Sequence, residues 1–315
     1  MEEEINTKGR QDLLIKVAKM YYLEKMSQQE IAEKVFLSRS NISHLLKKCV
    51  DQNIVEFYIN ESSAIRKDFH EYLIKKYNLK DIIIVSSEIN SNETKKKLGE
   101  ALYFYLRKKL YPGMSLGITW GTTIYHVLSA LKPISNISID VVQMLGGINT
   151  ETEDTDSRRM TYYLANILNG NAYVPLVPYI VNNEKLKDML LVEPGVIEHF
   201  KRISKIEIAL VGLGAIPKYI NTPAKAGYFT DEDIDHLKKC GAVLNLCGIM
   251  FDKNGTRCAK KISDRIIGCS YEMIANIPEV IAIAVGKEKV DAIKSALHTG
   301  LVSILATDEN AALSL

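Results

Sequence analysis

The sequence is poor in cysteine, and its few cysteines are not arranged for disulfides or for a metal. Five Cys occur among 315 residues, an odd number, and no two of them form a Cys-x-x-Cys pair. This pattern argues against a disulfide framework and against a zinc site. We interpret the cysteines as small core residues, and we find no signal for a metal ion or another cofactor.

Long apolar runs are also lacking. No run approaches the roughly 18 residues that cross a bilayer, and the opening stretch, MEEEINTKGR, has no apolar core like that of a signal peptide. We therefore expect a cytoplasmic protein that does not enter a membrane.

The third absence is a large excess of charge of one sign. The net charge is +2, with 25% charged and 47% hydrophobic residues. Such a balance excludes a polyanion-binding surface spread over the whole molecule, so any nucleic-acid site has to be local. The composition is that of a globular chain, and at roughly 100 to 200 residues per domain its length suits two domains.

The N-terminal region carries the signals of three helices. Apolar residues recur at helical spacing from Gln11 and predict a first helix that ends near Lys25. Ser27, followed three residues later by Glu30, has the pattern of a capping box and predicts a second helix through Val35.

A corner with the sequence Phe-Leu-Ser follows, and Ser38 can cap a third helix. The expected inner face of this helix consists of Ile42, Leu45, Leu46, Cys49 and Val50. Residues 53–60, NIVEFYIN, then have the composition of a strand and would form a wing. The layout predicts a winged helix-turn-helix, in which the second helix crosses the DNA backbone and the third enters the major groove.

Positive charge is concentrated in this region. Residues 8–50 hold nine Lys or Arg and four Asp or Glu, a local charge of +5, where phosphate contacts would need it. Arg39, Asn41 and His44 suit base edges, and their polar neighbours suit backbone oxygens. The predicted DNA-binding residues are Ser27, Gln28, Ser38, Arg39, Ser40, Asn41, Ser43, His44, Lys47 and Lys48. The alternative is a three-helix packing module whose basic face is solvated.

The rest of the chain alternates between apolar strand-like segments and helical segments. After a linker helix over residues 61–80, strands are expected at 81–87, 114–121, 139–147, 206–215, 242–251, 280–287 and 302–309. Short apolar strands with intervening helices predict an α/β domain with a mainly parallel, doubly wound sheet. Asn254-Gly255 predicts an inserted hairpin turn. We therefore divide the chain into a domain at 1–60, the linker helix and a domain at 81–315.

The second expected strand ends in a turn that is suited to an anion. Gly121 lets a ligand approach the backbone, and Thr122 and Thr123 begin a helix whose free N–H groups and hydroxyls are donors. Phosphate is the ligand that best suits such a turn. The alternative is an ordinary strand-to-helix turn with a threonine cap.

Ligands of open α/β sheets collect at the carboxyl ends of the strands. The third expected strand ends in Gly146-Gly147, and Gln143 and Asn149 beside it are candidates for contacts to sugar hydroxyls. We expect all four residues to lie at the edge of the sheet where a ligand binds.

Two lysines follow a later strand. Lys287 or Lys289 could supply a point charge to a phosphate, and the alternative for both is a solvated lysine at a helix start. No set of nucleophile, base and acid stands out, so we expect no catalytic residues and no enzyme.

Six motifs occur along the chain in a specific order: MYYLEKMSQQEIAEKVFLSRSNISHLLKK, LGITWGTT, VVQMLGG, GAVLNLCGIMFDKNG, IPEVIAIAVGKEKVDAIKSAL and ILATDENAA. This order resembles that of the SorC family of bacterial transcriptional regulators, from about residue 10 to the end. The resemblance implies an N-terminal helix-turn-helix and a sugar-binding domain similar to glucosamine-6-phosphate deaminase. It also implies a homotetramer or dimer of dimers, whose binding to operator DNA is altered by a phosphorylated sugar.

The resemblance also assigns roles to individual residues. The phosphate site of the family maps onto Gly121, Thr122, Thr123 and Lys289, which favours Lys289 over its neighbour Lys287.

At other positions this chain differs from family members whose effector is known. Some family members have a lysine, which can form a Schiff base, or an arginine where this chain has Leu145, which argues against a covalent aldehyde complex. Asn245 stands where the family often has an acid, which is consistent with another sugar preference. Thr155 and Asp156 fall in a family loop that reaches the ligand.

The sequence therefore predicts a carbohydrate-responsive transcriptional regulator. In this hypothesis, ligand binding shifts the population of subunit arrangements and changes how paired recognition helices fit their half-sites. One rival is a sugar-phosphate isomerase or deaminase, which requires a placed general base. The other is an assembly module whose basic helix contacts an acidic protein without any effector.

Overall fold

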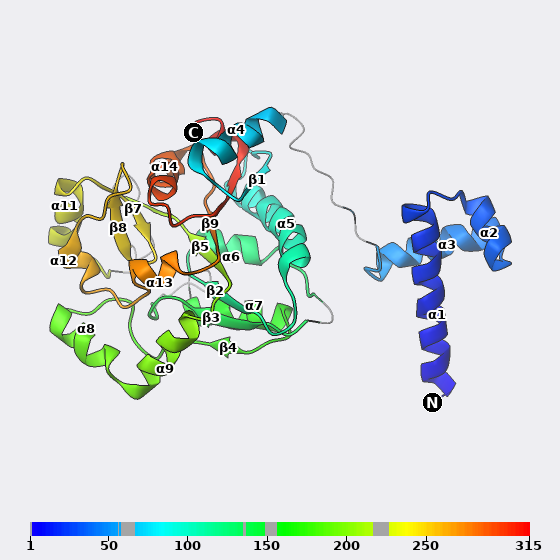
Figure 1. The fold of residues 1–315 in the computed structure, drawn as a ribbon, viewed down its shortest axis with the longest axis horizontal. Coiled ribbons are helices and arrows are strands. Elements are labelled where there is room, and N and C mark those ends of the chain that lie inside the picture. Colours follow the sequence, from blue (N-terminus) through cyan, green and yellow to red (C-terminus); the bar gives the residue numbers. More distant parts are fainter. Residues whose placement is uncertain (1, 56, 58–66, 135–136, 149–155, 217–226) are drawn as a thin grey trace. The chain divides into compact units, whose positions relative to one another are not determined.

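The structure is a computed structural model of the 315-residue chain. It describes residues 2–55, 57, 67–134, 137–148, 156–216 and 227–315. The chain forms two compact units, Met1–Ile59 and Asn60–Leu315 (Figure 1). Within these described ranges, no helix is long and apolar enough to cross a membrane.

The first unit is helical. It consists of α1 (Glu2–Ala18), a π-helical turn η1 (Lys19–Leu23), α2 (Gln28–Val35) and α3 (Arg39–Asp51). The predicted start of the first helix at Gln11 was wrong: the helix already begins at Glu2, because no proline in the polar opening stretch interrupts it. The spacing of apolar residues indicates only the part of a helix that packs against a core. The polar first turns were therefore not predicted.

Both predicted caps are present. The Ser27 hydroxyl accepts from the backbone N–H of Glu30 at 3.3 Å, and the Glu30 carboxylate accepts from the N–H of Ser27 at 2.7 Å, which completes the capping box. The Ser38 hydroxyl accepts from the N–H of Asn41 at 3.2 Å and begins α3. The caps fix the start of both helices and therefore the corner between them.

A small core holds these helices together. Val17, Ile31, Ile42 and Leu46 are buried in one cluster. The prediction that Val50 faces inward was wrong, since 38% of it is exposed at the end of α3 and the neighbouring Cys49 takes the buried position.

Half of the predicted wing strand, residues 53–60, lies outside the described residues. Its described part at Ile54 and Val55 is a bend in which both amides donate to the carbonyl oxygen of Cys49, at 2.8 and 2.9 Å. At these two positions the backbone ends α3 and does not begin a strand.

Phe36 occupies the corner between α2 and α3 at a cost in backbone energy. It has a left-handed φ of 56° and is 92% exposed. We expect Phe36→Gly to stabilise the first unit by about 0.5 to 1 kcal/mol, because relief of left-handed strain exceeds the entropy that glycine adds to the unfolded chain. Hydrogen exchange of the α2 and α3 amides in the full chain measures this gain. Phe36→Ala is the control, because it removes the ring but keeps the strain; equal protection in both variants would contradict the argument.

The second unit contains a parallel sheet of seven strands in the order β1-β10-β9-β5-β2-β3-β4. The strands are β1 (Asp81–Val85), β2 (Ser115–Ile118), β3 (Asp140–Gln143), β4 (Ala172–Tyr173), β5 (Ile208–Gly212), β9 (Glu279–Ile283) and β10 (Ile304–Asp308). All six strand pairings are parallel. The prediction of an α/β unit with a mainly parallel sheet is confirmed, although β4 escaped it because two residues carry no periodic signal.

Several helices of the second unit cover this sheet (Figure 1). The helices described in this unit are α4 (Lys67–Tyr77), α5 (Ser91–Lys109), α6 (Thr122–Leu128), α7 (Ser157–Ile167), α8 (Glu184–Leu191), α9 (Pro194–Ile203), α11 (Asp231–Lys239), α12 (Lys260–Ser263), α13 (Tyr271–Ala275), α14 (Val290–His298) and α15 (Glu309–Ala312). α5 packs on β1 and β10, α6 on β5, and α7 on β3 and β4. Of the predicted linker helix at 61–80, residues 61–66 lie outside the described chain, and α4 packs against β1 of the second unit.

A small antiparallel sheet joins β6 (Gly214–Ala215), β7 (Ala242–Leu246) and β8 (Ile249–Asp252). The prediction of one strand over 242–251 was wrong. Cys247 and Gly248 both have positive φ, 50° and 84°, and turn the chain back after β7. The predicted turn at Asn254-Gly255 also forms, because the Gly255 N–H donates to the Asp252 carbonyl and an antiparallel bridge joins residues 251 and 257.

Candidate functional site

The first unit presents a polar, exposed face on α3. Arg39, Ser40, Asn41, Ser43, His44 and Lys47 are exposed, as is Ser38, whereas Lys48 and Gln28 are half-buried. Ser27 and Ser38 already accept N-cap hydrogen bonds, and Ser38 also bonds to Ser40 at 2.9 Å. The residues predicted to contact DNA therefore lie at the starts of α2 and α3 and along the outer face of α3.

In the second unit, three adjacent strands bring the predicted phosphate residues to one edge. β5 lies between β2 and β9. Gly121 and Thr122 follow β2, and Lys289 follows β9, so they start from carboxyl ends on either side of β5 in a parallel sheet. A hydrogen bond joins the ends of β5 and β2: the Gly212 N–H at the end of β5 donates to the hydroxyl of Thr119, just after β2, at 3.0 Å.

Gly121 has a backbone conformation that favours glycine, with φ 144° and ψ 160°. A Cβ at this position would meet nothing within 4 Å, so the space beside it is open. Thr122 is exposed and Thr123 half-buried at the start of α6. The turn therefore offers backbone and hydroxyl donors to an approaching ligand.

Lys289 and Lys287 differ in their surroundings, although both belong to the short 3-10 helix η3 (Lys287–Lys289). Lys287 is exposed, whereas Lys289 is half-buried and donates from Nζ to the Leu213 carbonyl at 3.1 Å. Burial lowers the pKa of Lys289, Glu288 opposes this effect, and Lys95 adds to it. An amine held in this way is suited to gain a phosphate partner.

An aromatic group that the sequence did not reveal lies beside this edge. Trp120 donates from Nε1 to the Gly146 carbonyl at 3.2 Å and packs edge-on against Tyr179, with 4.9 Å between the ring centroids. Asn245 donates from Nδ2 to the Tyr179 hydroxyl at 3.1 Å, and a Cβ on Gly214 would lie 3.2 Å from the Asn245 side chain. These contacts bring Asn245 together with the strand end at Gly146.

The other predicted effector residues are placed differently. Gln143 is 1% exposed, donates to the Leu145 carbonyl at 2.6 Å and accepts from Thr161 at 3.4 Å, so its amide is already engaged. Gly146 is packed so closely that a Cβ would lie 2.2 Å from the Pro178 carbonyl, and Gly147 is half-buried.

Asn149 and Thr155 lie outside the described residues. Asp156 caps α7 by accepting from the backbone N–H groups of Arg158 and Arg159. Next to it, the Ser157 hydroxyl is buried and has no hydrogen-bond partner within the part of the chain that is described. A Cβ on Gly147 would lie 4.0 Å from this hydroxyl, so Ser157 is a further polar group at the same edge. Its position could not be read from the sequence, because a serine at a helix start is normally a cap.

Acids and histidines near the edge have structural partners. Asp308 is 2% exposed and accepts from the Gly286 N–H at 2.7 Å and the Ser87 hydroxyl at 2.6 Å. His199 donates from Nε2 to the Gln143 carbonyl at 2.8 Å. Within the ranges described above, no group of three or more His, Cys, Asp or Glu is placed to hold a metal ion.

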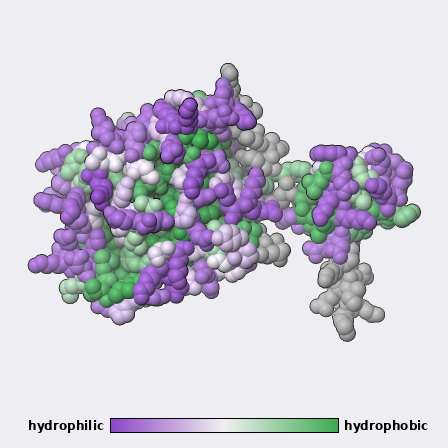
Figure 2. Space-filling model, in the orientation of Figure 1, coloured by the Kyte–Doolittle hydropathy of each residue, from purple (hydrophilic) through white to green (hydrophobic). Residues whose placement is uncertain are grey.

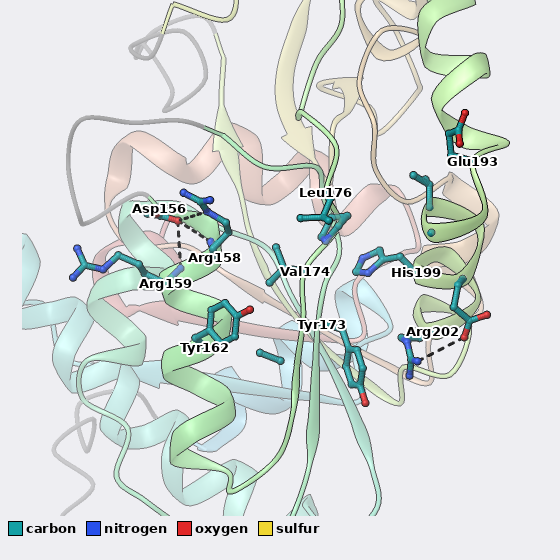
Figure 3. A pocket seen from close by; sticks show the side chains of 15 residues that line it. Asp156, Arg158, Arg159, Tyr162, Tyr173, Val174, Leu176, Glu193, His199 and Arg202 are labelled. Carbon is teal, nitrogen blue, oxygen red and sulfur yellow. Dashed lines mark hydrogen bonds and ion pairs between the residues drawn. The ribbon is translucent and has the colours of Figure 1, made fainter.

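A separate cavity of about 760 Å³ opens between α7 and α9. Figure 3 shows Asp156, Arg158 and Tyr162 on one side and His199 and Arg202 on the other. The Arg202 guanidinium lies 4.0 Å from the centre of the Tyr173 ring. Neither the predicted phosphate turn nor Lys289 lines this cavity.

Comparison with known proteins identifies both parts of the chain. Residues 65–315 match the family described as "Putative sugar-binding domain", and residues 24–56 match "Winged helix-turn-helix DNA-binding". The "Deoxyribonucleoside regulator" of Bacillus subtilis is 28% identical over 97% of each chain. The "Sorbitol operon regulator" of Klebsiella pneumoniae is 25% identical over 95% of this chain and 96% of that protein.

Solved structures agree with this assignment. A structure described as "Putative Sugar-Binding Domain of Transcriptional Repressor from Vibrio fischeri" matches with a TM-score of 0.73 and 26% identity, over 79% of this chain and 98% of that one. The full-length sorbitol operon regulator SorC of Klebsiella pneumoniae has the same fold, with a TM-score of 0.77 at 24% identity, over 96% of this chain and 97% of that one.

The fold and the two matches define a sugar-responsive transcriptional regulator with an N-terminal helix-turn-helix. The chain belongs to the SorC/DeoR family of such regulators. The relatives are transcriptional regulators and not enzymes, which confirms the expectation that this chain is not an enzyme.

Proposed function

We propose that this chain binds operator DNA through α3 and that a phosphorylated sugar at the carboxyl edge of the parallel sheet controls this binding. The placement of Gly121, Thr122 and Lys289 at the carboxyl ends of β2 and β9, the two strands that flank β5, carries the proposal. A glycine turn with an open approach, two hydroxyls and a half-buried amine are donors of the kind that phosphate binds. We place the regulator in the cytoplasm, where its DNA is, and expect a homotetramer or dimer of dimers.

The sugar part of the ligand would lie beside the aromatic group. Trp120 contacts Tyr179, which in turn contacts Asn245, and the Ser157 hydroxyl beside Gly147 can bind a sugar hydroxyl. Relatives named for deoxyribonucleosides and sorbitol support a sugar or polyol as the class of ligand. Leu145 at the strand end has no amine, so contacts there are noncovalent.

The DNA part of the proposal predicts a specific loss on substitution in α3. Arg39 is exposed at the first position of this helix, where side chains reach base edges. We expect Arg39→Ala to weaken operator binding about 5- to 150-fold, since a bidentate pair to guanine contributes about 1 to 3 kcal/mol. Lys16→Ala is the matched control, because Lys16 is an exposed cation of the same unit on α1. Equal losses in both variants would mean that charge alone explains the Arg39 effect.

One experiment tests the whole proposal. Fluorescence anisotropy follows labelled DNA from upstream of the protein's own operon, at fixed salt and with excess competitor DNA. A panel of phosphorylated and unphosphorylated sugars is added to the complex. The proposal requires a competitor-resistant complex whose affinity changes with a sugar phosphate; a complex that competitor abolishes and that no sugar alters would overturn it.

A further inference from the structure

Asp308 is an acid that lies inside the second unit. Hydrophilic side chains cover much of the face of this unit that Figure 2 shows, whereas Asp308, at the end of β10, is 2% exposed. Burying a carboxylate costs free energy unless hydrogen bonds satisfy it. The hydrogen-bond partners of Asp308 therefore indicate its role.

The Asp308 side chain is not used as its position in the chain predicts. Asp308 is the N-cap residue of α15, where an aspartate normally accepts from the first N–H groups of its own helix. Within the described segment 305–315, its side chain makes no such bond. Instead, Oδ1 accepts from the Gly286 N–H at 2.7 Å, and Oδ2 accepts from the Ser87 hydroxyl at 2.6 Å. The carboxylate thus joins the segments that follow β9 and β1 to the end of β10, the strand between them.

The bond to Gly286 takes the place of a main-chain bond of the sheet. β9 and β10 are parallel, and the Ala284 N–H donates to the Ala306 carbonyl at 3.1 Å. One step farther along this ladder, the Gly286 N–H would meet the Asp308 carbonyl, but the Asp308 side chain accepts it instead. The chain can therefore leave the sheet at Gly286 and still be attached to β10.

Gly286 begins the turn that bears Lys289. Its φ of 105° favours glycine, and a Cβ there would lie 2.3 Å from a carboxylate oxygen of Glu288. The Gly286 carbonyl accepts from the Lys289 N–H at 3.0 Å, and Nζ of Lys289 donates to the Leu213 carbonyl at 3.1 Å. The lysine is therefore held at two points, by Asp308 through Gly286 and by Leu213 at its tip.

We propose that Asp308 is a positioning residue, which holds the turn from Gly286 to Lys289 so that the Lys289 amine is placed for a bound phosphate. Both carboxylate oxygens already accept hydrogen bonds, so the acid acts through Lys289 and not by touching the ligand. An amine that is ordered in advance raises affinity, because binding does not have to order it. The ligand in this inference rests on the proposed function, whereas the position of the lysine does not.

Acetylation of lysines in the full chain, measured by mass spectrometry, tests this role without knowledge of the sugar. The exposed Lys287 of the same turn is the internal reference. We expect Asp308→Ala to raise the acetylation rate of Lys289 relative to that of Lys287, because the amine leaves the Leu213 carbonyl. Inorganic phosphate, added at constant ionic strength, should protect Lys289 in the parent. The phosphate concentration for half protection should rise about 5- to 30-fold in Asp308→Ala, the effect of about one lost hydrogen bond.

Further variants separate position from charge and from damage to the fold. Asp308→Asn keeps an oxygen for the Gly286 N–H without the negative charge, so it should return the Lys289 rate toward that of the parent. Thr307→Val is the matched control, because Thr307 is buried beside Asp308 on β10 and its hydroxyl has no hydrogen-bond partner in the described part of the chain. Thermal melting shows which variants fold. If Asp308→Ala does not, Ser87→Ala removes one donor to the same carboxylate and should act on Lys289 in the same direction, less strongly.

The outcomes separate the positioning role from the proposed function. The role is overturned by an unchanged Lys289 rate in folded Asp308→Ala, or in Ser87→Ala where that variant takes its place. An Asp308→Asn protein that behaves like Asp308→Ala, an equal change in Thr307→Val, or half protection at the parent's phosphate concentration also overturns it. If Asp308→Ala makes Lys289 more reactive but phosphate does not protect Lys289 in the parent, the proposed phosphate site is wrong and the hold of Asp308 on the lysine stands.

Discussion

Replacing Lys289 with alanine should remove most of the effector response and leave operator binding intact. A hydrogen bond to a charged group contributes about 1.5 to 3 kcal/mol, so we expect effector affinity to fall about 10- to 150-fold. Burial lowers the pKa of the Lys289 amine, and a bound phosphate would raise that pKa again because it favours the charged form. Thr122→Ala at the facing turn should weaken the response in the same direction.

The chain offers a close control for this variant. Lys287 belongs to the same 3-10 helix but is exposed, so Lys287→Ala removes one positive charge without removing the buried amine. Anisotropy titrations of the operator complex with the active sugar phosphate give both affinities. A loss of equal size in both lysine variants, or a normal response in Lys289→Ala and Thr122→Ala, would contradict the phosphate assignment.

The second large effect concerns stability. Arg265 donates to both carboxylate oxygens of Asp233, at 2.7 and 3.2 Å, and its Nε donates to the Val181 carbonyl at 3.1 Å. Removing one partner of a buried ion pair costs about 3 to 5 kcal/mol, and we expect the lower end for Arg265→Met because 23% of the Arg265 side chain stays exposed. The free energy of unfolding in urea measures this loss.

The loss should depend on pH in a defined direction. Burial raises the pKa of Asp233, but hydrogen bonds from Arg265 and Thr230 outweigh it and lower the pKa below its ordinary value of 3.8. The ion pair therefore stabilises the fold above pH 3.8, and its contribution disappears as the pH falls through the lowered pKa. The difference between parent and Arg265→Met should shrink in that acid range.

An exposed pair provides the control. Lys260 and Asp264 lie 3.1 Å apart one helical turn from each other, and the Lys260 side chain is 85% exposed. Lys260→Met should change the free energy of unfolding by less than about 0.5 kcal/mol. If both methionine variants lose the same amount, burial of Asp233 is not the reason for the effect.

The sequence predicted an element correctly where the evidence for it lay within the residues of that element. Ser27 and Ser38 predicted the starts of α2 and α3, because a cap is decided within four residues. The strands of the parallel sheet were visible as apolar runs for a similar reason. The turn at Cys247-Gly248 that separates β7 from β8 was missed. Gly248 was the only residue there whose type indicates a positive φ.

Features that depend on contacts between distant segments were not visible. Trp120 and Tyr179 are far apart in the chain and meet only in the folded sheet, and the buried hydroxyl of Ser157 can be recognised only from its surroundings. The choice between Lys287 and Lys289 came from family resemblance, since spacing alone treated the two lysines as equivalent. The structure gives them different environments, whereas their roles toward a ligand stay predictions.

The small core of the first unit has a consequence for temperature. Two clusters of five and three buried residues hold the described helices together, whereas the second unit has one extensive core around its sheet. Small cores confer little stability, and the strained backbone of Phe36 reduces it further. On warming, the helices that bear Arg39 should therefore melt first, and operator recognition would be lost while the sheet domain stays folded and able to bind its ligand.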